Sequence, residues 1–136
     1  MNILFFLTPK AMCANVDADD TIREAMGRME SAGYAALPIL NRDGSYAGVL
    51  TEGDLLWALK RICGMDLRCA EQHGIREIVP RREVQAVTVT TRVEDLLNVA
   101  AEQNFVPVVD DRGMFVGIVT RRSILNYYRE KIKNLP

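Results

Sequence analysis

Residues 48–56 of the 136-residue chain read GVLTEGDLL, and residues 117–125 read GIVTRRSIL. In both stretches a glycine begins a short apolar run that ends on a threonine, and a second apolar segment follows. A strand that continues directly into a helix explains this order, because a threonine hydroxyl can accept a hydrogen bond from the first turn of a helix. The stretches differ at the third helical position, where Asp54 in the first is matched by Ser123 in the second.

The whole chain repeats itself around this junction. Pro38 aligns with Pro107 and Gly44 with Gly113. Each copy reads as a short strand, a helix, two strands joined by a turn, and a second helix. Two small sheets that each bury one face are expected to pack together. We therefore predict an α+β fold of tandem β-α-β-β-α repeats with pseudo-twofold symmetry.

The predicted boundaries follow from the repeat. The first repeat, with an N-terminal arm, is expected over residues 1–60, a linker over 61–75, and the second repeat with the C-terminal helix over 76–136. The apolar start ILFFL is too short for a signal peptide or for a membrane span of about 20 residues. It is expected to be a strand or docking arm that packs on the body.

Apolar periodicity supports the helices of both repeats. The spacing i, i+3, i+4, i+7 of a buried stripe occurs at Ile22, Ala25, Met26 and Met29, and again at Val93, Leu96, Leu97 and Ala100. Asp20 and Thr21 are expected N-terminal caps of the first helix. The apolar second helices need cover from outside their own unit, which indicates a homodimer. The side chains expected at that interface are Leu55, Trp57, Leu59, Ile124 and Tyr127.

Composition excludes several classes of function. The net charge is −1, so no excess of positive charge attracts nucleic acid or anionic lipid, and we expect neither partner. The cysteines Cys13, Cys63 and Cys69 are odd in number and lack CxxC spacing, which argues against a disulfide framework or a four-ligand zinc site. We expect unpaired thiols, no metal, and a reducing cytoplasm.

No catalytic set is visible in the sequence. The single histidine, His73, falls in the predicted linker without an adjacent nucleophile or ligand spacing, and we expect it to be solvated or packed. There is no glycine-rich phosphate loop. The chain is therefore not expected to be an enzyme.

The first junction has two interpretations. In one, Thr51 and Asp54 form an ordinary capping box at a helix start. In the other, Asp54 accepts hydrogen bonds from both hydroxyls of a ribose, and Thr51 binds a phosphate oxygen beside the helix N-terminus. Small and apolar residues that leave room for a flat base and offer walls to it are Gly48, Ala35, Ala36, Val49 and Tyr34.

The second junction carries Thr120, Arg121, Arg122 and Ser123. A serine cannot form the paired bonds that a carboxylate makes to a diol. Two arginines at a helix start are unfavourable beside the positive end of the helix dipole. They are either a solvated surface pair or the holders of a nearby anion.

The repeated segments GYAALPIL-NRDG-SYAGVLTEGDLL and NFVPVVDDRGMFVGIVTRRSIL resemble cystathionine-β-synthase (CBS) domains. Together they resemble a CBS pair, or Bateman module, over about Thr8 to Tyr128. The resemblance implies a disc-shaped dimer of pairs. It also implies that adenine nucleotides, namely AMP, ADP, ATP, S-adenosylmethionine or cyclic di-AMP, bind in clefts between the repeats.

The resemblance assigns residues to both clefts. In the first, Asp54 would hold the ribose with help from Thr51, and Arg122 with Thr120 would reach the phosphate. The other expected ligand-binding residues are Val49, Tyr34, Ala35, Ala36, Gln85, Ala86, Val87 and Arg121. The mirrored second cleft would use Cys13, Ala14, Phe105, Val106 and Ser123, together with Thr120. Because the family usually has aspartate where Ser123 stands, the clefts are expected to be unequal. The TRR run resembles small CBS proteins that bind cyclic di-AMP through arginines.

Two functions are consistent with these residues. The first is a regulatory module that binds an adenine nucleotide in the cleft between the repeats and signals to an unknown regulated protein. The second is a structural or dimerisation module with empty clefts. A nucleotide that stabilises the folded chain would distinguish them.

Overall fold

The computed structural model describes residues 1–79 and 83–136. The chain forms two compact units. The first-repeat unit is Ala14–Glu83, and the second-repeat unit joins Met1–Cys13 to Val84–Pro136. The predicted order β-α-β-β-α is confirmed in both units.

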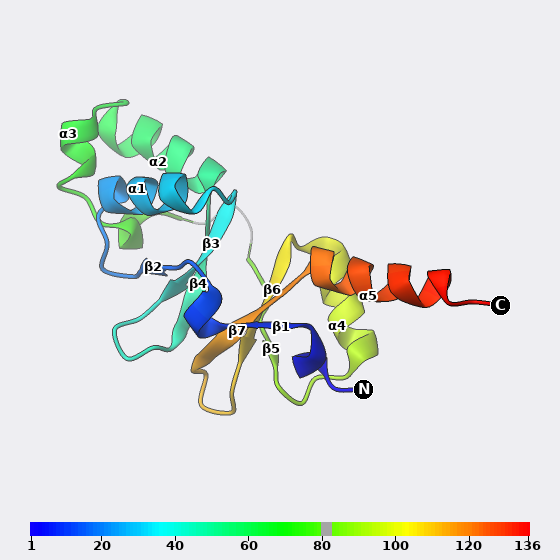
Figure 1. Ribbon diagram of the computed structural model, residues 1–136. Coiled ribbons are helices and arrows are strands. Elements are labelled where there is room, and N and C mark those ends of the chain that lie inside the picture. The colour runs from blue at the N-terminus through cyan, green and yellow to red at the C-terminus, as the bar shows by residue number, and fades with distance from the viewer. Residues whose placement is uncertain (80–82) are drawn as a thin grey trace. The chain divides into compact units, whose positions relative to one another are not determined.

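The first-repeat unit is a three-stranded sheet with helices packed on it (Figure 1). Its elements are β2 (Val16–Asp17), α1 (Ile22–Ala32), β3 (Ala36–Leu40), β4 (Tyr46–Thr51), α2 (Glu52–Cys63), α3 (Leu67–Ala70) and η3 (Ile75–Glu77). The strand order is β2-β3-β4, with β2 parallel and β4 antiparallel to β3.

Most local signals predicted for this unit are present, but Asp20 accepts the Asp17 N–H at 2.9 Å and does not cap α1. Thr21 caps α1 in a reciprocal capping box with Glu24, with both hydrogen bonds at 3.0 Å. The hairpin between β3 and β4 turns at Gly44, whose φ of 89° is favourable for glycine. Ile22, Ala25 and Met29 are buried on one face of α1, as the periodicity predicts.

The second-repeat unit is a four-stranded sheet. Its elements are η1 (Ile3–Phe6), β1 (Leu7–Pro9), η2 (Lys10–Met12), β5 (Val87–Thr88), α4 (Val93–Glu102), β6 (Phe105–Val109), β7 (Phe115–Thr120) and α5 (Arg121–Lys133). The strand order is β1-β7-β6-β5. Leu96 and Ala100 of α4 are buried, and Gly113 turns the β6–β7 hairpin at a φ of 79°.

The N-terminal arm docks as predicted, but on the other repeat. Strand β1 pairs antiparallel with β7, with Thr8 opposite Ile118. Ile3 is fully buried, and Phe6 is nearly so, in the core of the second-repeat unit. The arm therefore completes the sheet of the second repeat, although the sequence assigned it to the domain of the first. Edge pairing between distant segments leaves no local sequence signal, which explains the difference.

The segment 61–75, expected to be a linker, belongs to the first-repeat unit. It contains the end of α2, all of α3 and the start of η3. Ala70 is fully buried, and Ile75 and Cys63 are nearly so, in the same core as α1. The segment is thus part of the packed interior.

None of the helices in the described part of the chain combines the length and the apolar character that crossing a membrane requires.

Candidate functional site

The first junction is an intact capping box. Thr51 is the N-cap of α2, and its hydroxyl accepts a 3.0 Å hydrogen bond from the Asp54 amide. The Asp54 carboxylate in turn accepts the Thr51 N–H at 3.0 Å. Asp54 is only 5% exposed. The capping interpretation is therefore confirmed. A carboxylate can accept several hydrogen bonds, so a ribose contact by Asp54 stays a prediction.

Some of the predicted cleft residues lie beside this junction within the same unit. Ala36 is the antiparallel partner of Thr51 across β3 and β4. The carbonyl of Ala35 accepts the Glu52 N–H at 2.9 Å, so the backbone of residues 35–36 borders the start of α2. Tyr34 is 63% exposed, whereas Val49 is buried. The backbone of Ala35 and Ala36 therefore lies at the start of α2, whereas a contact of these residues with a base stays a prediction.

The second junction is capped in a different way. Thr120 caps α5 by accepting the Ser123 N–H at 3.1 Å. The Ser123 hydroxyl donates to the carbonyl oxygen of Thr120 at 2.8 Å, where Asp54 accepts the N-cap N–H in the first repeat. The exchange of aspartate for serine therefore removes a negative charge and reverses the direction of one hydrogen bond.

The two arginines of the second junction have different surroundings. Arg121 donates to the carbonyl oxygens of Ala100 and Ala101 at 2.9 and 3.1 Å, near the end of α4. A cation at the C-terminal end of a helix is favourable, so Arg121 has a structural role that the sequence did not indicate. Arg122 is exposed and has no hydrogen-bond or ion-pair partner among the residues that the structure describes.

Gln103 is a residue that the sequence analysis missed. Its side-chain oxygen accepts the Gln85 N–H at 2.7 Å, and its amide nitrogen donates to the Gln85 carbonyl at 3.0 Å and to that of Phe105 at 3.2 Å. Gln85 precedes β5, where Ala86 and the buried Val87 follow it. The backbone N–H and carbonyl of Gln85, one of the expected ligand-binding residues, are thus paired with Gln103. No local pattern in the sequence indicates these contacts.

The residues assigned to the second cleft fall in different environments. Val106 is fully buried in the core of the second-repeat unit, and Phe105 and Ser123 are half-buried. Cys13 donates from Sγ to the carbonyls of Thr8 and Pro9 at 3.4 and 3.3 Å, and burial raises the pKa of its thiol. Cys13 is the last residue of the N-terminal arm, which belongs to the second-repeat unit, whereas Ala14 is the first residue of the first-repeat unit.

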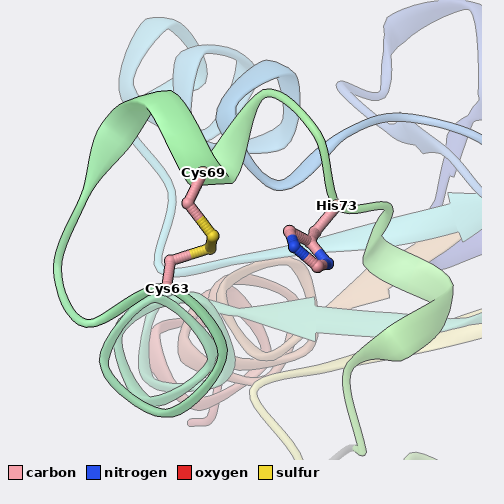
Figure 2. A group of neighbouring side chains, drawn as sticks. All are labelled: Cys63, Cys69 and His73. Carbon is pink, nitrogen blue, oxygen red and sulfur yellow. A yellow bond between two sulfur atoms is a disulfide. The ribbon is translucent and has the colours of Figure 1, made fainter.

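The expectation that all cysteines are unpaired was wrong. Cys63 and Cys69 form a disulfide with a Cα–Cα distance of 5.3 Å, and Figure 2 shows His73 beside it. The chain turns between α2 and α3 at Gly64 and Met65, which both have positive φ, and this turn brings Cys69 next to Cys63 at the end of α2. Cysteine usage therefore no longer argues for the cytoplasm.

These repeats and junctions define a class of protein: paired β-α-β-β-α modules whose second helices begin at capped strand ends. The family model for the CBS domain matches residues 13–61 and 75–130. The chain belongs to the CBS domain family.

Comparisons with known proteins agree with this assignment. Inosine-5'-monophosphate dehydrogenase of Methanocaldococcus jannaschii is 29% identical over 116 residues, which are 81% of this chain and 20% of that protein. The chain spans at most about a fifth of the length of the curated relatives it matches.

Solved structures share the fold of nearly the whole chain. A crystal structure of CbpB in complex with c-di-AMP matches with a TM-score of 0.87 and 20% identity, covering 98% of this chain and 88% of the other. CBSX2 in complex with AMP matches with a TM-score of 0.75 and 21% identity, covering 98% of both chains. At sequence identities this low, the similarity establishes the shared tandem fold alone.

Proposed function

We propose that the protein is a regulatory module that binds an adenine nucleotide of the AMP, ADP, ATP or cyclic di-AMP type. It passes the occupancy of that site to a partner protein and is not an enzyme. The nucleotide is expected at the strand-to-helix junctions of the repeats. Because the chain spans only a small part of its curated relatives, their catalytic activities are not carried over.

The capped first junction carries this proposal. Asp54 is buried and ionisable at a helix N-terminus, beside the small residues Ala35 and Ala36. A carboxylate held there can bind a diol, and the N–H groups of the first turn favour an anion. Structural neighbours solved with AMP and with c-di-AMP support an adenine nucleotide as the ligand class.

The second junction is proposed to bind the phosphate part of the ligand. Arg122 is exposed at the start of α5, close to Thr120, and its planar guanidinium suits a phosphate or phosphodiester. Arg121 donates hydrogen bonds to carbonyl oxygens near the end of α4, so its proposed role is to hold the end of α4 against the start of α5. With Ser123 in place of a carboxylate, a diol is expected only at the first junction.

We further propose that the module is a homodimer. Of the side chains expected at the interface, Leu55, Leu59 and Ile124 are buried within their own units. The neighbouring Leu56 and Leu125 are 48% and 66% exposed, and they are equivalent in the two repeats. Leu56 borders a groove of about 650 Å³ between α1 and α2. A second copy of the chain is the proposed occupant of this face.

A panel of AMP, ADP, ATP, S-adenosylmethionine and cyclic di-AMP tests the function by thermal unfolding. A ligand at 100 times its dissociation constant adds about 2.7 kcal/mol to the free energy of unfolding. At least one nucleotide is expected to raise the melting temperature, whereas inorganic phosphate is the control and should not. If none of the panel does so, the alternative of a structural dimerisation module with empty clefts is favoured.

A further inference from the structure

Three potential metal ligands gather in the first-repeat unit, away from both junctions. Cys63 ends α2, Cys69 lies in α3, and His73 follows three residues after α3. One ligand atom of each residue lies within 4.8 Å of the others. Figure 2 shows the imidazole ring of His73 next to the two sulfur atoms. The sequence predicts neither the cluster nor a metal, because 61–75 reads there as a linker.

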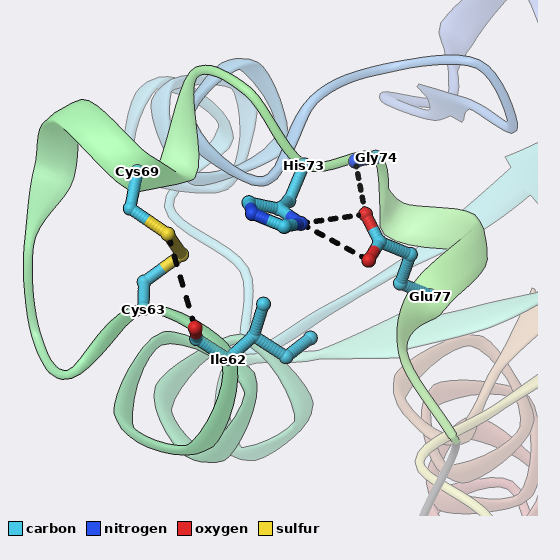
Figure 3. Close-up of polar contacts among 6 residues, drawn as sticks. All are labelled: Ile62, Cys63, Cys69, His73, Gly74 and Glu77. Carbon is cyan, nitrogen blue, oxygen red and sulfur yellow. Dashed lines mark hydrogen bonds and ion pairs between the residues drawn. A yellow bond between two sulfur atoms is a disulfide. The ribbon is translucent and has the colours of Figure 1, made fainter.

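The carboxylate of Glu77, which is not itself one of the three potential ligands, holds the His73 ring in an orientation suited to metal binding. Its Nδ1 lies 3.0 and 2.9 Å from the two carboxylate oxygens of Glu77. The Gly74 N–H donates to the same carboxylate at 3.2 Å, which fixes the position of Glu77. Figure 3 shows the His73 ring between Glu77 and the cysteine sulfurs. A proton on Nδ1, shared with Glu77, leaves the lone pair of Nε2 available to a metal.

The surroundings of the cluster favour a cation. Cys63 is the last residue of the twelve-residue helix α2, so the negative end of the helix dipole lies at its sulfur. The carbonyl oxygen of Ile62 is 3.9 Å from Cys69 Sγ.

The backbone that carries the ligands is tied to the body of the unit. The carbonyl of His73 accepts the Ile22 N–H at 2.9 Å, and the Ile75 N–H donates to the carbonyl of Asp20 at 2.9 Å. Ala70, next to Cys69, is fully buried. A ligand set on such a fixed backbone loses little conformational freedom when it binds an ion.

We propose that the reduced chain binds one Zn²⁺ ion through Cys63, Cys69 and His73, and that the Cys63–Cys69 disulfide excludes the ion. Two thiolates and one imidazole match the ligand preference of zinc, and water supplies the fourth position. A tetrahedral zinc ion holds its sulfur ligands about 3.8 Å apart. The disulfide must therefore open before the ion can enter.

The two states interconvert by balanced chemistry. A small dithiol reductant transfers two electrons and two protons to the disulfide, which yields two thiols and the cyclic disulfide of the reductant. Zinc then replaces the two thiol protons, which are released to solvent. Both steps take place at the Cys63 and Cys69 sulfurs.

Cobalt titration of the reduced full-length chain tests the site. Co²⁺ in a tetrahedral thiolate site absorbs visible light, and its thiolate charge-transfer band reports sulfur ligation directly. We expect one equivalent of Co²⁺ per chain, displaced by one equivalent of Zn²⁺. The chain oxidised to the disulfide should show no such band.

Variants assign the ligands. Cys63→Ser and Cys69→Ser should abolish the charge-transfer band, and His73→Gln should weaken Zn²⁺ binding at least 100-fold. Glu77→Gln should weaken it by about 10–100-fold, as expected for an outer partner of a ligating histidine. The matched control Cys13→Ser removes the remaining cysteine and should leave the band unchanged.

The proposal is wrong if the reduced wild type shows no Co²⁺–thiolate band, or if the band persists in Cys69→Ser. It is also wrong if His73→Gln binds Zn²⁺ with the affinity of the wild type. Circular dichroism establishes that each variant is folded. Cys69 and His73 are less buried than Cys63, so the Cys69 and His73 variants test the proposal even if substitution of Cys63 disturbs folding.

Discussion

Asp54 and Ser123 occupy the same helical position in the two repeats, and the hydrogen bonds around them differ accordingly. Asp54 accepts from the N-cap N–H, whereas Ser123 donates to the N-cap carbonyl. Both arrangements cap a helix, so capping alone does not require a carboxylate. The first repeat therefore has a carboxylate at Asp54 that the helix cap does not require, and the proposed ribose contact gives a reason for it.

Replacing Asp54 by Asn should weaken adenine-nucleotide binding by about 1.5–3 kcal/mol, because the charged acceptor of the diol is lost. The asparagine oxygen can still accept the Thr51 N–H, so the helix cap is largely preserved. Calorimetric titration measures the change in affinity, and thermal unfolding of the free variant monitors the cap.

The charge-matched control is Asp111→Asn, in the turn between β6 and β7. It removes an exposed carboxylate outside both junctions and should leave the affinity for the mononucleotide within a factor of about two, as expected for a surface substitution. Binding of Asp54→Asn with the affinity of the wild type would disprove the ribose role.

At the scale of elements, the two units differ at a pair of equivalent glycines, Gly48 in β4 and Gly117 in β7. Both have positive φ angles, 148° and 155°. A Cβ at Gly48 would meet only Ile39 Cδ1, at 4.0 Å, whereas a Cβ at Gly117 would clash with the backbone oxygen of Thr8 in the arm. Close approach of β1 to β7 therefore requires glycine in the second repeat.

Gly117→Ala should destabilise the chain by about 1–3 kcal/mol more than Gly48→Ala, as expected for overpacking against a backbone. The backbone strain at positive φ is common to both variants and cancels in the comparison. Urea unfolding measures both. Equal destabilisation by the two substitutions would mean that the arm does not dock on β7 in solution.

The regular elements could be predicted from the sequence, and the long-range contacts could not. Helices α1 and α4 follow from apolar spacing, and the hairpins follow from Gly44 and Gly113, because these signals are local. The docking of the arm, the burial of Ala70 and the Cys63–Cys69–His73 cluster depend on contacts between segments that carry no pattern. The Gln103 contacts to Gln85 were missed for the same reason.

At the scale of the whole molecule, the exposed side chains of Leu56 and Leu125 are the basis of the proposed homodimer. The prediction of apolar second helices holds for α2 but not for α5, in which Ile124 is the one buried residue. It misplaces the exposed side chains by one position, because the packing within each unit takes up Leu55, Leu59 and Ile124. Leu56 and Leu125 are equivalent positions in the two repeats, so a twofold assembly could use the same kind of apolar contact in both.

Leu56→Glu should convert the proposed dimer to monomer, because a carboxylate buried in an apolar interface lacks a partner. Sedimentation velocity at several protein concentrations measures the change. Leu135→Glu makes the same change at an exposed leucine beyond the end of α5, and this control should leave the dimer intact. A wild type that sediments as a monomer at every concentration contradicts the proposal.

Nuclear magnetic resonance of the isotope-labelled chain, titrated with AMP and with cyclic di-AMP, tests the nucleotide site most directly. The account predicts saturable shifts of the backbone amides of Thr51–Asp54 with at least one of the two nucleotides, and of Arg121–Ser123 in the same titration. Spectra that stay unchanged at these amides with millimolar nucleotide would contradict it.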